Sequence, residues 1–433
     1  MTESFNPSRL PLPRFRPATA ADLCVPTACV PADASNGDVL ALFTGRRELM
    51  TLPVVEEGRP IGLICRNIFM SQMSKPFYQE LYGRKSCIAF MDKDPLVVDA
   101  GLGIEALTFR AVESGEKALA DGFIITRAGQ LQGVGFGLQL MNVVADMQAE
   151  RNRQIMHSIE YASVIQRALL RASDDALAAA LPDAGLVWQP RDVVGGDFYH
   201  VARYPDGWCA VIADCTGHGV PGAFMTLIAS SLLTQALQAL GPRDPAALLA
   251  ELNRGVKDML GQHMPGQPAA VQTAGGQAVG AGYGPGQYNK GASLSNDGLD
   301  AAVLWFDGAT RHLSYAGARL PLFVLAPDGD AFGVLEPDRM GAGYAETPAG
   351  HRWPVHAVHL PPGSLLFTGT DGLFDQIGGE RDISFGKRRA QRLLLERRDD
   401  PAAGLAALLA AELARWQGGQ PRRDDVTFLC CRP

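Results

Sequence analysis

The sequence predicts a multidomain α/β protein, and three features support that fold class. The chain has 433 residues, which is more than a single hydrophobic core usually organises. Residues 22–140 contain two similar runs of strand and helix patterns in tandem, which indicates an internal repeat. Residues 181–433 contain short apolar strands flanked by aspartates, with amphipathic helices among them. The first residues, 1–21, are rich in proline and arginine, and we expect them to be irregular.

Composition excludes several classes of protein. Hydrophobic residues make up 47% of the chain and the formal net charge is −7, with no basic run of the kind that binds nucleic acid. The eight cysteines include no C-x-x-C pair, so we expect reduced thiols. The first residues lack a signal-peptide pattern, and the apolar segment 222–240 contains hydroxyl and amide side chains typical of a buried helix. We therefore expect a cytoplasmic protein that binds neither a membrane nor nucleic acid.

The tandem repeat consists of a helical stretch and a hairpin in each copy. The expected elements are a helix at 38–43 and a hairpin at 51–55 and 60–64, then a strand at 96–98, a helix at 104–113 and a hairpin at 121–126 and 131–135. The hairpins LPVVEEGRPIGLI and DGFIITRAGQLQGVG resemble those of a pair of CBS modules. That resemblance implies a cleft that binds an adenine nucleotide, and a purely structural or dimerising role is the alternative.

Residues 141–180 are expected to form a helical linker. Apolar residues recur three or four positions apart and Pro182 is the first helix breaker; the stripe comprises Leu140, Val144, Met147, Ile155, Ile159, Ala162 and Leu169. Two interpretations remain open. The helix packs on its own domain, or it pairs with a second chain as a short coiled coil and makes a homodimer. A helix that leaves one domain and enters another can also transmit a signal by shifting its register.

The C-terminal region, 181–433, predicts a layered α/β sandwich with a cleft. Its expected strands are 208–213, 299–306, 312–317, 321–325, 364–368 and a last one at 426–430, and its expected helices are 223–240, 389–397 and 401–416. Residues 261–292 interrupt this pattern with glycine, alanine, glutamine and proline. They contain too few aliphatic residues to form a core, so we expect a flexible insertion.

Aspartates stand at the ends of several of these strands. The stretch ADCTGHGVPGA at 213–223 follows a buried strand, places a carboxylate at its end and then turns through glycines. The acidic residues in equivalent places are Asp197, Asp214, Asp371, Asp424 and Asp425. Carboxylates without cysteine or histidine at metal-ligand spacing favour Mg²⁺ or Mn²⁺ over Zn²⁺. The sequence therefore predicts an oxygen-ligand metal centre.

Four motifs, taken together, resemble the metal-dependent protein phosphatases of the PPM (type 2C-like) family, SpoIIE/RsbU subgroup. They are GGDFY at 195–199, DCTGHG at 214–219, TDGL at 370–373 and RDDVT at 423–427, in that order. The resemblance covers about residues 182–433 and implies an αββα sandwich with two Mn²⁺ or Mg²⁺ ions between its sheets. The implied ligands are Asp214 to both ions, the Cys215 carbonyl and Asp197 to the first, Asp371 and Asp424 to the second, and Asp425 to a weaker further ion.

The catalytic residues expected from this resemblance are Asp214, Asp371 and Asp424. Two cations roughly 3.5–4 Å apart can bridge one water and lower its pKa toward ~7, which gives a nucleophile for in-line attack on phosphorus without a phospho-enzyme. The expected reaction is hydrolysis of phosphoserine or phosphothreonine on a partner protein. The resemblance implies that this partner is an anti-sigma-factor antagonist in a partner-switching pathway, with regulation by the N-terminal domain through the helical linker.

Two other functions are alternatives to a phosphatase. One is a nucleotide-sensing scaffold whose phosphatase-like region has little or no turnover. The other is a cyclic-dinucleotide synthase, suggested by the run GGDF at 195–198. The synthase is disfavoured because Phe198 stands where such enzymes carry a further acid, and because it leaves Asp371 and Asp424 unexplained.

Overall fold

The computed structural model describes residues 19–262 and 296–433, which fall into two compact units. Unit 1 runs from Met1 to Ile155 and unit 2 from Met156 to Pro433. The insertion expected at 261–292 lies outside the described residues, apart from its first two positions. A single long helix, α6 (Gly137–Ala180), contributes residues to both units.

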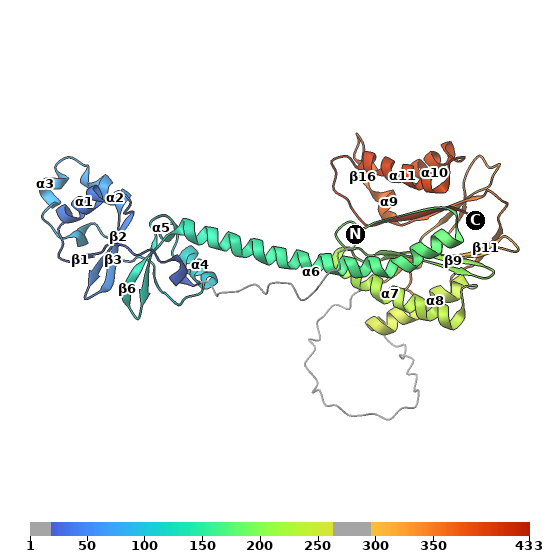
Figure 1. The fold of residues 1–433 in the computed structure, drawn as a ribbon, viewed down its shortest axis with the longest axis horizontal. Helices are drawn as coiled ribbons and strands as arrows, with labels where there is room; N and C mark the ends of the chain where they lie inside the picture. Colours follow the sequence, from blue (N-terminus) through green and yellow to red (C-terminus); the bar gives the residue numbers. More distant parts are fainter. Residues whose placement is uncertain (1–18, 263–295) are drawn as a thin grey trace, which may run out of the picture. The chain divides into compact units, whose positions relative to one another are not determined.

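Unit 1 contains two copies of one strand arrangement, which confirms the tandem repeat (Figure 1). In each copy a short strand pairs parallel with the first strand of a hairpin, and the two hairpin strands pair antiparallel. The strands are β1 (Val30–Pro31), β2 (Thr51–Glu56) and β3 (Arg59–Cys65) in the first copy, and β4 (Val97–Asp99), β5 (Phe123–Arg127) and β6 (Gln130–Gly135) in the second. The helices are α1 (Asn36–Gly45), α2 (Arg66–Met73), α3 (Tyr78–Tyr82), α4 (Ile104–Glu113) and α5 (Glu116–Ala120), with 3₁₀ turns η2 (Ala20–Leu23) and η3 (Cys87–Ala89).

The two hairpins share the same turn chemistry. Glu57 and Gly58 have φ angles of 48° and 79°, and Ala128 and Gly129 have φ angles of 52° and 78°. Two successive residues with positive φ are typical of a type I′ turn, whose twist matches that of the paired strands. Glycine at the second position accommodates this conformation without strain. The repeat is therefore preserved in the turns as well as in the strands.

The start of the described chain is more ordered than the sequence suggested. We expected irregular structure through residue 21, but Ala20–Leu23 form the turn η2. The Asp22 carboxylate accepts a hydrogen bond from the Thr19 backbone N–H at 2.8 Å, which caps this turn. Ala20 and Leu23 are buried in the core of the second copy. The composition of the segment did not reveal that these two side chains are buried, which is why the turn was not expected.

Helix α6 buries different faces along its length. Near its start, Leu140 is buried in the core of the second copy of unit 1, and Val143, Val144 and Met147 pack against that core. Near its end, a second face is buried in unit 2; its residues are Ser163, Gln166, Leu170 and Ser173. Part of the apolar stripe therefore packs on the protein's own cores. Tyr161, Val164, Ile165 and Leu169 are exposed.

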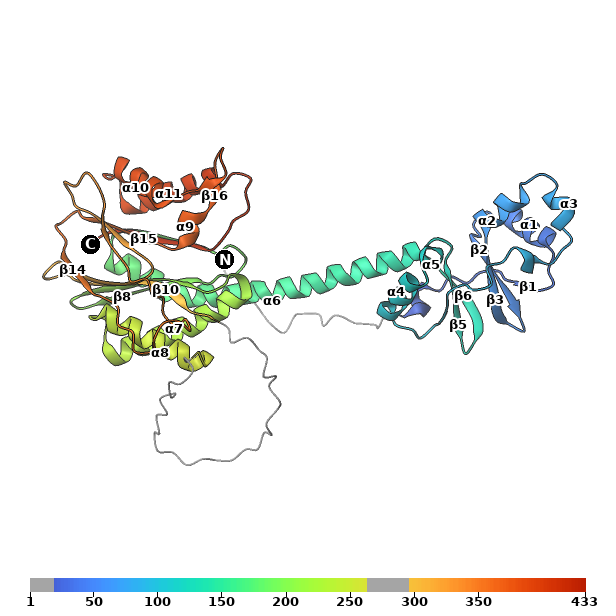
Figure 2. The ribbon, with the colours of Figure 1, turned by 180° about the vertical axis from the view of Figure 1, so that it is seen from behind.

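Unit 2 is a sandwich of two five-stranded antiparallel sheets with helices on both outer faces (Figures 1 and 2). The first sheet, in spatial order, comprises β14 (His356–His359), β11 (His312–Ala318), β10 (Leu299–Asp307), β9 (Gly207–Cys215) and β8 (Asp197–Tyr204). The second comprises β13 (Gly333–Leu335), β12 (Leu322–Leu325), β15 (Leu365–Gly369), β18 (Val426–Arg432) and β7 (Asp183–Gln189). Helices α7 (Gly219–Leu240) and α8 (Pro245–Leu260) cover the first sheet, and α9 (Asp371–Asp375), α10 (Lys387–Glu396) and α11 (Ala402–Gln417) cover the second.

Strand periodicity divides the second sheet between two cores. Leu366 and Leu429 belong to the core shared with the first sheet, whereas Phe367, Phe428 and Cys430 belong to the core under α10 and α11. Successive side chains of a strand point to opposite faces, so strands buried on both faces appear in sequence as continuous apolar runs. This explains why the strands of β15 and β18 were recognisable from the sequence, as were β9, β10, β11 and β12.

One helix boundary and three short or half-buried strands differ from the sequence-based expectation. Helix α7 begins at Gly219, four residues before the expected start, because Gly219 and Gly222 of the GHGVPG run lie in the helix and Gly217 remains in the turn. Strand β7 was not expected; it pairs with β18 from Val426↔Gln189 to Arg432↔Asp183. Its residues are only partly buried, which is why the segment lacks a strong apolar signal. The short pair β16 (Ile377–Gly378) and β17 (Ile383–Ser384) was also not expected.

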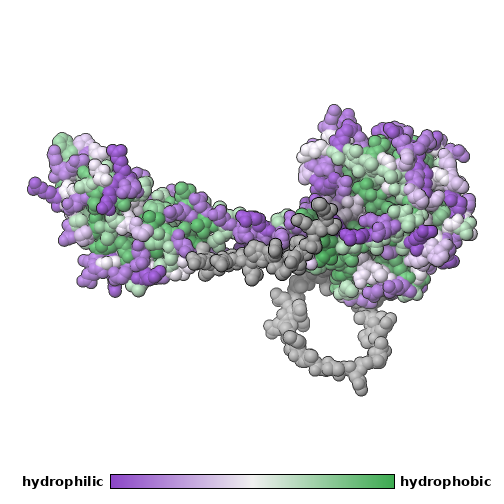
Figure 3. Space-filling view, in the orientation of Figure 1, coloured by the Kyte–Doolittle hydropathy of each residue, from purple (hydrophilic) through white to green (hydrophobic). Residues whose placement is uncertain are grey.

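Among the described residues, α7 is the one helix long and apolar enough to cross a membrane by length and composition alone. Its face of Met225, Ala229, Leu233 and Ala236 is buried in the core of unit 2. Figure 3 shows hydrophobic residues on the visible face of unit 2 in the region of α7 and α8, mixed with hydrophilic ones. The helix therefore has a structural role in the sandwich, as expected from its hydroxyl and amide side chains.

Candidate metal centre

Three aspartates form a row across the first sheet. On β8 and β9, Asp197 lies directly opposite Asp214, and on β9 and β10, Asp214 lies directly opposite Asp300. Residues directly opposite one another in an antiparallel sheet have Cα atoms about 4.5–5.5 Å apart and side chains on the same face. The register of three strands therefore places three carboxylates in one row, with Asp214 in the middle.

The second sheet contributes acids from two adjacent strands. Asp371 is the first residue of α9, immediately beyond β15, and Asp424 and Asp425 precede β18. The two strand ends are joined by hydrogen bonds: the Thr370 N–H donates to the Thr427 carbonyl at 2.8 Å, and the Thr427 N–H donates to Thr370 Oγ1 at 3.0 Å. Asp371 and Asp424 are thereby brought to the same end of the second sheet.

A single hydroxyl connects the acids of the two sheets. The Thr370 hydroxyl donates to Asp197 Oδ2 at 2.8 Å, although the two residues are 173 positions apart in the sequence. In addition, the charge of Asp371 and that of Asp424 both act on Asp214. The structure thus places Asp197, Asp214, Asp371 and Asp424 at the same end of the sandwich, and their expected role as metal ligands stays a prediction.

Backbone packing around the glycine pair fixes the position of Asp197. A Cβ atom on Gly196 would lie 2.7 Å from the Cys215 carbonyl oxygen, so only glycine fits there. The Cys215 N–H donates to the Gly196 carbonyl at 3.1 Å. Both carboxylate oxygens of Asp425 accept backbone N–H groups of this loop, from Arg191 and from Gly196, each at 2.6 Å. The observed role of Asp425 is therefore to hold the loop; its expected role at a weaker ion stays a prediction.

Helix α6 is fastened to the same loop. The Gln166 side-chain amide donates to the Gly195 carbonyl at 2.7 Å and accepts from the Gly195 N–H at 3.2 Å. Gln166 is buried, so these are the contacts that satisfy its amide. About two turns of helix further on, the Tyr199 hydroxyl of β8 donates to the Asp174 carboxylate. The end of α6 in unit 2 is therefore connected to the residues on both sides of Asp197.

The acids differ in burial from the floor of the site to its rim. Asp197 is buried, Asp214, Asp300 and Asp424 are partly buried, and Asp371 is exposed. Burial, followed by the charge of Asp425, raises the pKa of Asp197 well above its ordinary value. Burial, followed by the charges of Asp197 and Asp371, raises the pKa of Asp214 in the same way, and burial followed by the charge of Asp424 raises that of Asp371. Burial raises the pKa of Asp300 to about 6.

These observations fit a divalent cation. Asp197 Oδ1 is buried and has no hydrogen-bond partner, which leaves it available to a cation. The donor set consists of carboxylate oxygens and a backbone carbonyl, which are the ligands that Mg²⁺ and Mn²⁺ prefer. No three acidic, cysteine or histidine side chains within the described ranges already converge on a point that would hold an ion. Like charges in a poorly solvated site repel one another, which keeps these carboxylates apart when no cation is bound. A bound cation would offset their charge, and rotamer changes of the more exposed aspartates could then bring the carboxylates together.

Asp300 and Gln166 are the site residues that the sequence did not identify. Asp300 is the second residue of the strand Leu299–Asp307 and Asp197 is the first residue of β8, but no GGD-like motif marks Asp300. Its position opposite Asp214 depends on the pairing of β9 with β10. Gln166 occurs within an ordinary helical pattern, and only its burial beside Gly195 distinguishes it.

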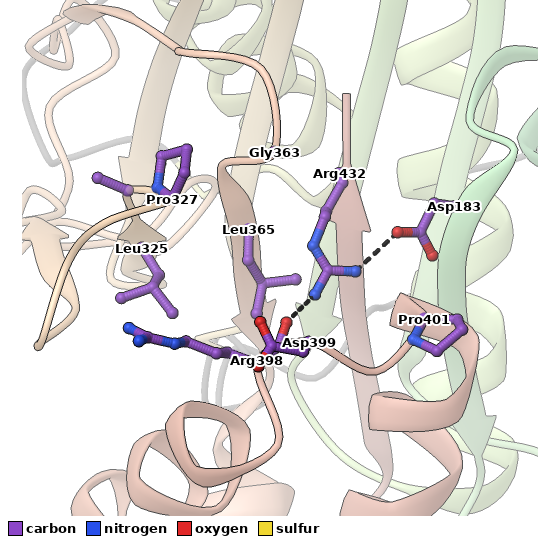
Figure 4. A pocket seen from close by; sticks show the side chains of 10 residues that line it. Asp183, Leu325, Pro327, Gly363, Leu365, Arg398, Asp399, Pro401 and Arg432 are labelled. Atoms are coloured by element: carbon purple, nitrogen blue, oxygen red, sulfur yellow. Dashed lines mark hydrogen bonds and ion pairs between the residues drawn. The ribbon is translucent and has the colours of Figure 1, made fainter.

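A separate pocket lies at the other end of the second sheet (Figure 4). Arg432 closes β18 there, pairs with Asp183 at 2.7 Å and donates to the Arg398 carbonyl. Because β18 rises by about 3.3 Å per residue, Arg432 lies roughly 20 Å along the strand from Val426, which follows Asp424 and Asp425. The pocket is therefore distinct from the aspartate site.

Comparisons with known proteins agree with this geometry. The family model of stage II sporulation protein E (SpoIIE) matches residues 204–433, which is more than half of the chain. The solved SiaA-PP2C domain of Pseudomonas aeruginosa is 35% identical with a TM-score of 0.54, and the match covers 66% of this chain and 99% of that domain.

Two further solved structures are more distant. The RsbU and RsbW domains of a Mycobacterium tuberculosis protein are 20% identical, with a TM-score of 0.42 and coverage of 58% of this chain and 59% of that one. The phosphatase domain and regulatory fragment of SpoIIE from Bacillus subtilis are 17% identical, with a TM-score of 0.41 and coverage of 58% and 62%. A comparison with curated proteins gave no significant match. From the matched family model, the related SiaA domain and the aspartates at one end of the sandwich, we conclude that the chain belongs to the SpoIIE family of PP2C-type protein serine/threonine phosphatases.

Proposed function

We propose that unit 2 hydrolyses phosphoserine and phosphothreonine on a partner protein at two Mn²⁺ or Mg²⁺ ions held by the convergent aspartates. The observation on which this rests is the meeting of two sheets: Asp197 lies opposite Asp214 and accepts the hydroxyl of Thr370, the residue before Asp371. The metal dependence of PP2C-type phosphatases supports the choice of ions, and the substrate follows from membership of the family.

The roles of the residues follow from their places in the sandwich. Asp214 occupies the middle of the row and is flanked by acids of both sheets, so it is suited to contact both ions. Asp371 and Asp424 would hold the second ion from the other sheet, and Asp197 and the Cys215 carbonyl would hold the first. When bound, such ions supply Lewis acidity toward phosphate oxygens and lower the pKa of water. Asp425 keeps the glycine loop in place through its two backbone hydrogen bonds.

The cysteine within the motif is unsuited to nucleophilic catalysis. Cys215 is buried, and burial followed by the charges of Asp214 and Asp197 raises the pKa of its thiol well above the ordinary value. A thiolate is the reactive form of cysteine, and this surrounding disfavours it. The proposed mechanism accordingly uses the Cys215 backbone and no side-chain nucleophile.

We also propose that α6 regulates the site through Gln166. The two hydrogen bonds between its amide and Gly195 place the helix one residue from Gly196 and two from Asp197. A shift of the helix by one turn, or its local unfolding, would remove both bonds and release the loop. This contact gives the N-terminal region a physical route to the metal ligands, and CBS-like ligand binding there is one signal that could use it.

A homodimer through α6 is proposed on the basis of its exposed apolar face. Tyr161, Val164, Ile165 and Leu169 are exposed, whereas Ser163, Gln166 and Leu170 are buried in unit 2. At 100° per residue the exposed set lies on the face opposite the buried set. A helix that has one buried face and a second, exposed apolar face is typical of a helix that packs against a partner on each side. A second copy of the same helix is the partner that such a face fits, in a symmetric pair.

The alternative function, a nucleotide-sensing scaffold, receives less support from unit 1. A pocket between the two copies of the repeat is lined by Asp92, Asp94, Glu113 and Asp121, with Lys117 as a basic residue. Lys117 pairs with Asp92 at 3.3 Å. This acidic lining opposes the phosphates of an adenine nucleotide. Binding of an adenine nucleotide therefore stays a prediction, and the phosphatase hypothesis has the better-defined site.

The first prediction concerns activity. Asp214→Asn should reduce Mn²⁺-dependent hydrolysis of a phosphoserine peptide by about 10³-fold or more, because it removes the charge shared by both proposed ions. Initial rates with and without added Mn²⁺ measure this, with Glu380→Gln as an exposed control that should match the wild type. Turnover that persists in a chelator, or in Asp214→Asn, would contradict the proposed chemistry.

The second prediction concerns stability without metal. The folded-state pKa of Asp197, Asp214 and Asp371 is raised, so their protonated forms favour folding and this stability is lost as pH rises above roughly 4 through the raised values. Metal-free unit 2 should therefore melt at a lower temperature at pH 8 than at pH 6. Asp214→Asn should raise the melting temperature at pH 8 by at least about 2 °C, because it removes one repelling charge.

Tryptophan fluorescence can follow this transition, since all five tryptophans lie in unit 2. Addition of Mn²⁺ should raise the wild-type melting temperature and leave that of Asp214→Asn almost unchanged. A metal-free melting temperature that does not depend on pH, or an Asp214→Asn protein less stable than the wild type at pH 8, would count against the electrostatic account.

The third prediction concerns Gln166. Gln166→Leu should leave the Gly195 N–H and carbonyl without their partners and should lower the rate about 10-fold, with a weaker apparent affinity for Mn²⁺. Arg167→Leu, at the exposed neighbouring position, should behave as the wild type. Metal titrations of the rate separate a loosened loop from general instability. Equal metal affinity in Gln166→Leu and wild type would refute the proposed coupling.

The fourth prediction concerns the proposed dimer. Val164→Glu should convert a dimer to a monomer, because it places a charge at the centre of the apolar face. Light scattering coupled to size-exclusion chromatography measures the mass of each form. Arg167→Glu, away from that face, should stay dimeric. A wild-type protein that is monomeric at micromolar concentration would refute the dimer.

A further inference from the structure

Arg319 adopts an unusual backbone conformation at the edge of the aspartate site. It follows the end of β11 with a φ of 60°, in the left-handed region that a non-glycine residue rarely occupies. Its N–H donates to the Asp338 carbonyl at 2.9 Å, and its backbone is bridged to Ala301, next to Asp300 on β10. Such strain persists where the surroundings impose it, and it is commonest at functional sites.

The guanidinium of Arg319 is held in place from four directions. Nη1 lies 3.4 Å from Asp300 Oδ1, and Nη2 lies 3.2 Å from Glu346 Oε1. Nε donates to the Arg339 carbonyl at 3.1 Å. The group also stacks 4.5 Å above the centre of the Tyr344 ring. An arginine anchored in this way loses little further conformational entropy when it binds a ligand.

These anchors belong to the surroundings of the proposed metal ligands. Asp300 is the cross-strand neighbour of Asp214, and the charge of Asp371 acts on it. Tyr344 interacts with Thr216, which lies within the DCTGHG motif, and with Asp300. Arg319 therefore places a positive charge beside the cluster of aspartates, on the side of the site formed by β10.

The guanidinium has donors to spare. It carries five N–H groups, and the three contacts above use one on Nε, one on Nη1 and one on Nη2. One N–H on each Nη nitrogen remains, and these form the fork that suits two oxygens of a phosphate. The Arg319 side chain is 35% exposed, so a ligand can reach it.

We propose that Arg319 binds a phosphoryl oxygen of the substrate, and that Asp300, Glu346 and Tyr344 are positioning residues that aim its guanidinium. This rests on the proposed function, because the phosphoryl group must first be held at the aspartate site. A phosphoserine dianion presents three oxygens, and a fixed arginine at the rim neutralises charge on an oxygen that the metal side does not reach. The ligand class is a phosphomonoester, and the contact is with its phosphoryl group, not with the peptide.

A purely structural role predicts different behaviour. In that case Arg319 only neutralises the partly buried Asp300, and its removal affects stability and not phosphate binding. Arg191, the basic residue nearest the first motif in the sequence, donates to the Arg423 carbonyl and is exposed. Its guanidinium makes this one hydrogen bond among the described residues, so the four contacts of the Arg319 guanidinium make Arg319 the better-oriented phosphate ligand of the two.

The test uses the full-length Mn²⁺-loaded protein with Arg319→Gln, Arg319→Lys and Asp300→Asn. Arg319→Gln should lower kcat/KM about 10–100-fold for both a phosphoserine peptide and p-nitrophenyl phosphate, and should raise the inhibition constant of inorganic phosphate by a similar factor. Arg319→Lys keeps the charge without the fork and should fall between the two. Asp300→Asn should have a smaller effect in the same direction. Arg415→Gln, an exposed arginine of α11 paired with Glu412, is the matched control.

The outcomes separate the inference from the proposed function. If the wild type has no metal-dependent turnover, the proposed function fails. If the wild type is active and Arg319→Gln and Arg319→Lys both retain its inhibition constant for phosphate, the inference is overturned, whatever happens to their melting temperatures. A peptide-specific loss with normal hydrolysis of p-nitrophenyl phosphate would also overturn it, because the contact would then be with the peptide.

Discussion

The crowding of carboxylates at one end of a sandwich is the constraint on which the rest of unit 2 depends. Burial and mutual repulsion raise the pKa of Asp197, Asp214 and Asp371. The fold therefore holds these carboxyl groups closer together than their charged forms favour. The surrounding fold provides the rigidity that this requires. Sheet register fixes Asp197 opposite Asp214, and the Thr370 hydroxyl ties Asp197 to the other sheet. A cation-binding reaction centre is a physical reason to maintain such an arrangement, because a cation converts the repulsion into attraction.

The same rigidity makes the glycine loop the proposed point of control. Gly196 lies so close to the Cys215 carbonyl that no side chain fits, and Asp425 fixes the loop from the second sheet. Gln166 fixes it from helix α6. A loop held at several points has a defined position, but it is sensitive to the loss of any one of them. The proposed regulation needs no long pathway through the sandwich, since the helix already contacts the residue next to the GD pair.

The positive charge at the rim complements the negative charge on the floor. Arg319 pairs with Asp300 and Glu346, so the protein balances part of its own acidic excess where the substrate is proposed to enter. Asp300 makes two kinds of contact. It extends the row of acids formed by Asp197 and Asp214, and its carboxylate accepts a hydrogen bond from the Arg319 guanidinium. In the proposed function, the metal ions and Arg319 would together offset the charge of a phosphomonoester dianion.

The sequence by itself determined the layered α/β class, the tandem repeat, the long helix and the four acidic motifs. It could do so because apolar periodicity and glycine turns are local signals: the runs of β9, β15 and β18 and the GGD and DGL motifs are visible without any partner. It misjudged the start of α7 and residues 20–21, and it missed β7, whose half-buried residues have no such pattern. Only the tertiary structure decided which groups meet. Asp300, Gln166 and Arg319 acquire their roles from the pairing of β10 with β9, the docking of α6 and a strained turn after β11, and each depends on residues far away in the chain. Contacts of that kind are set by packing and register, which no short stretch of sequence encodes.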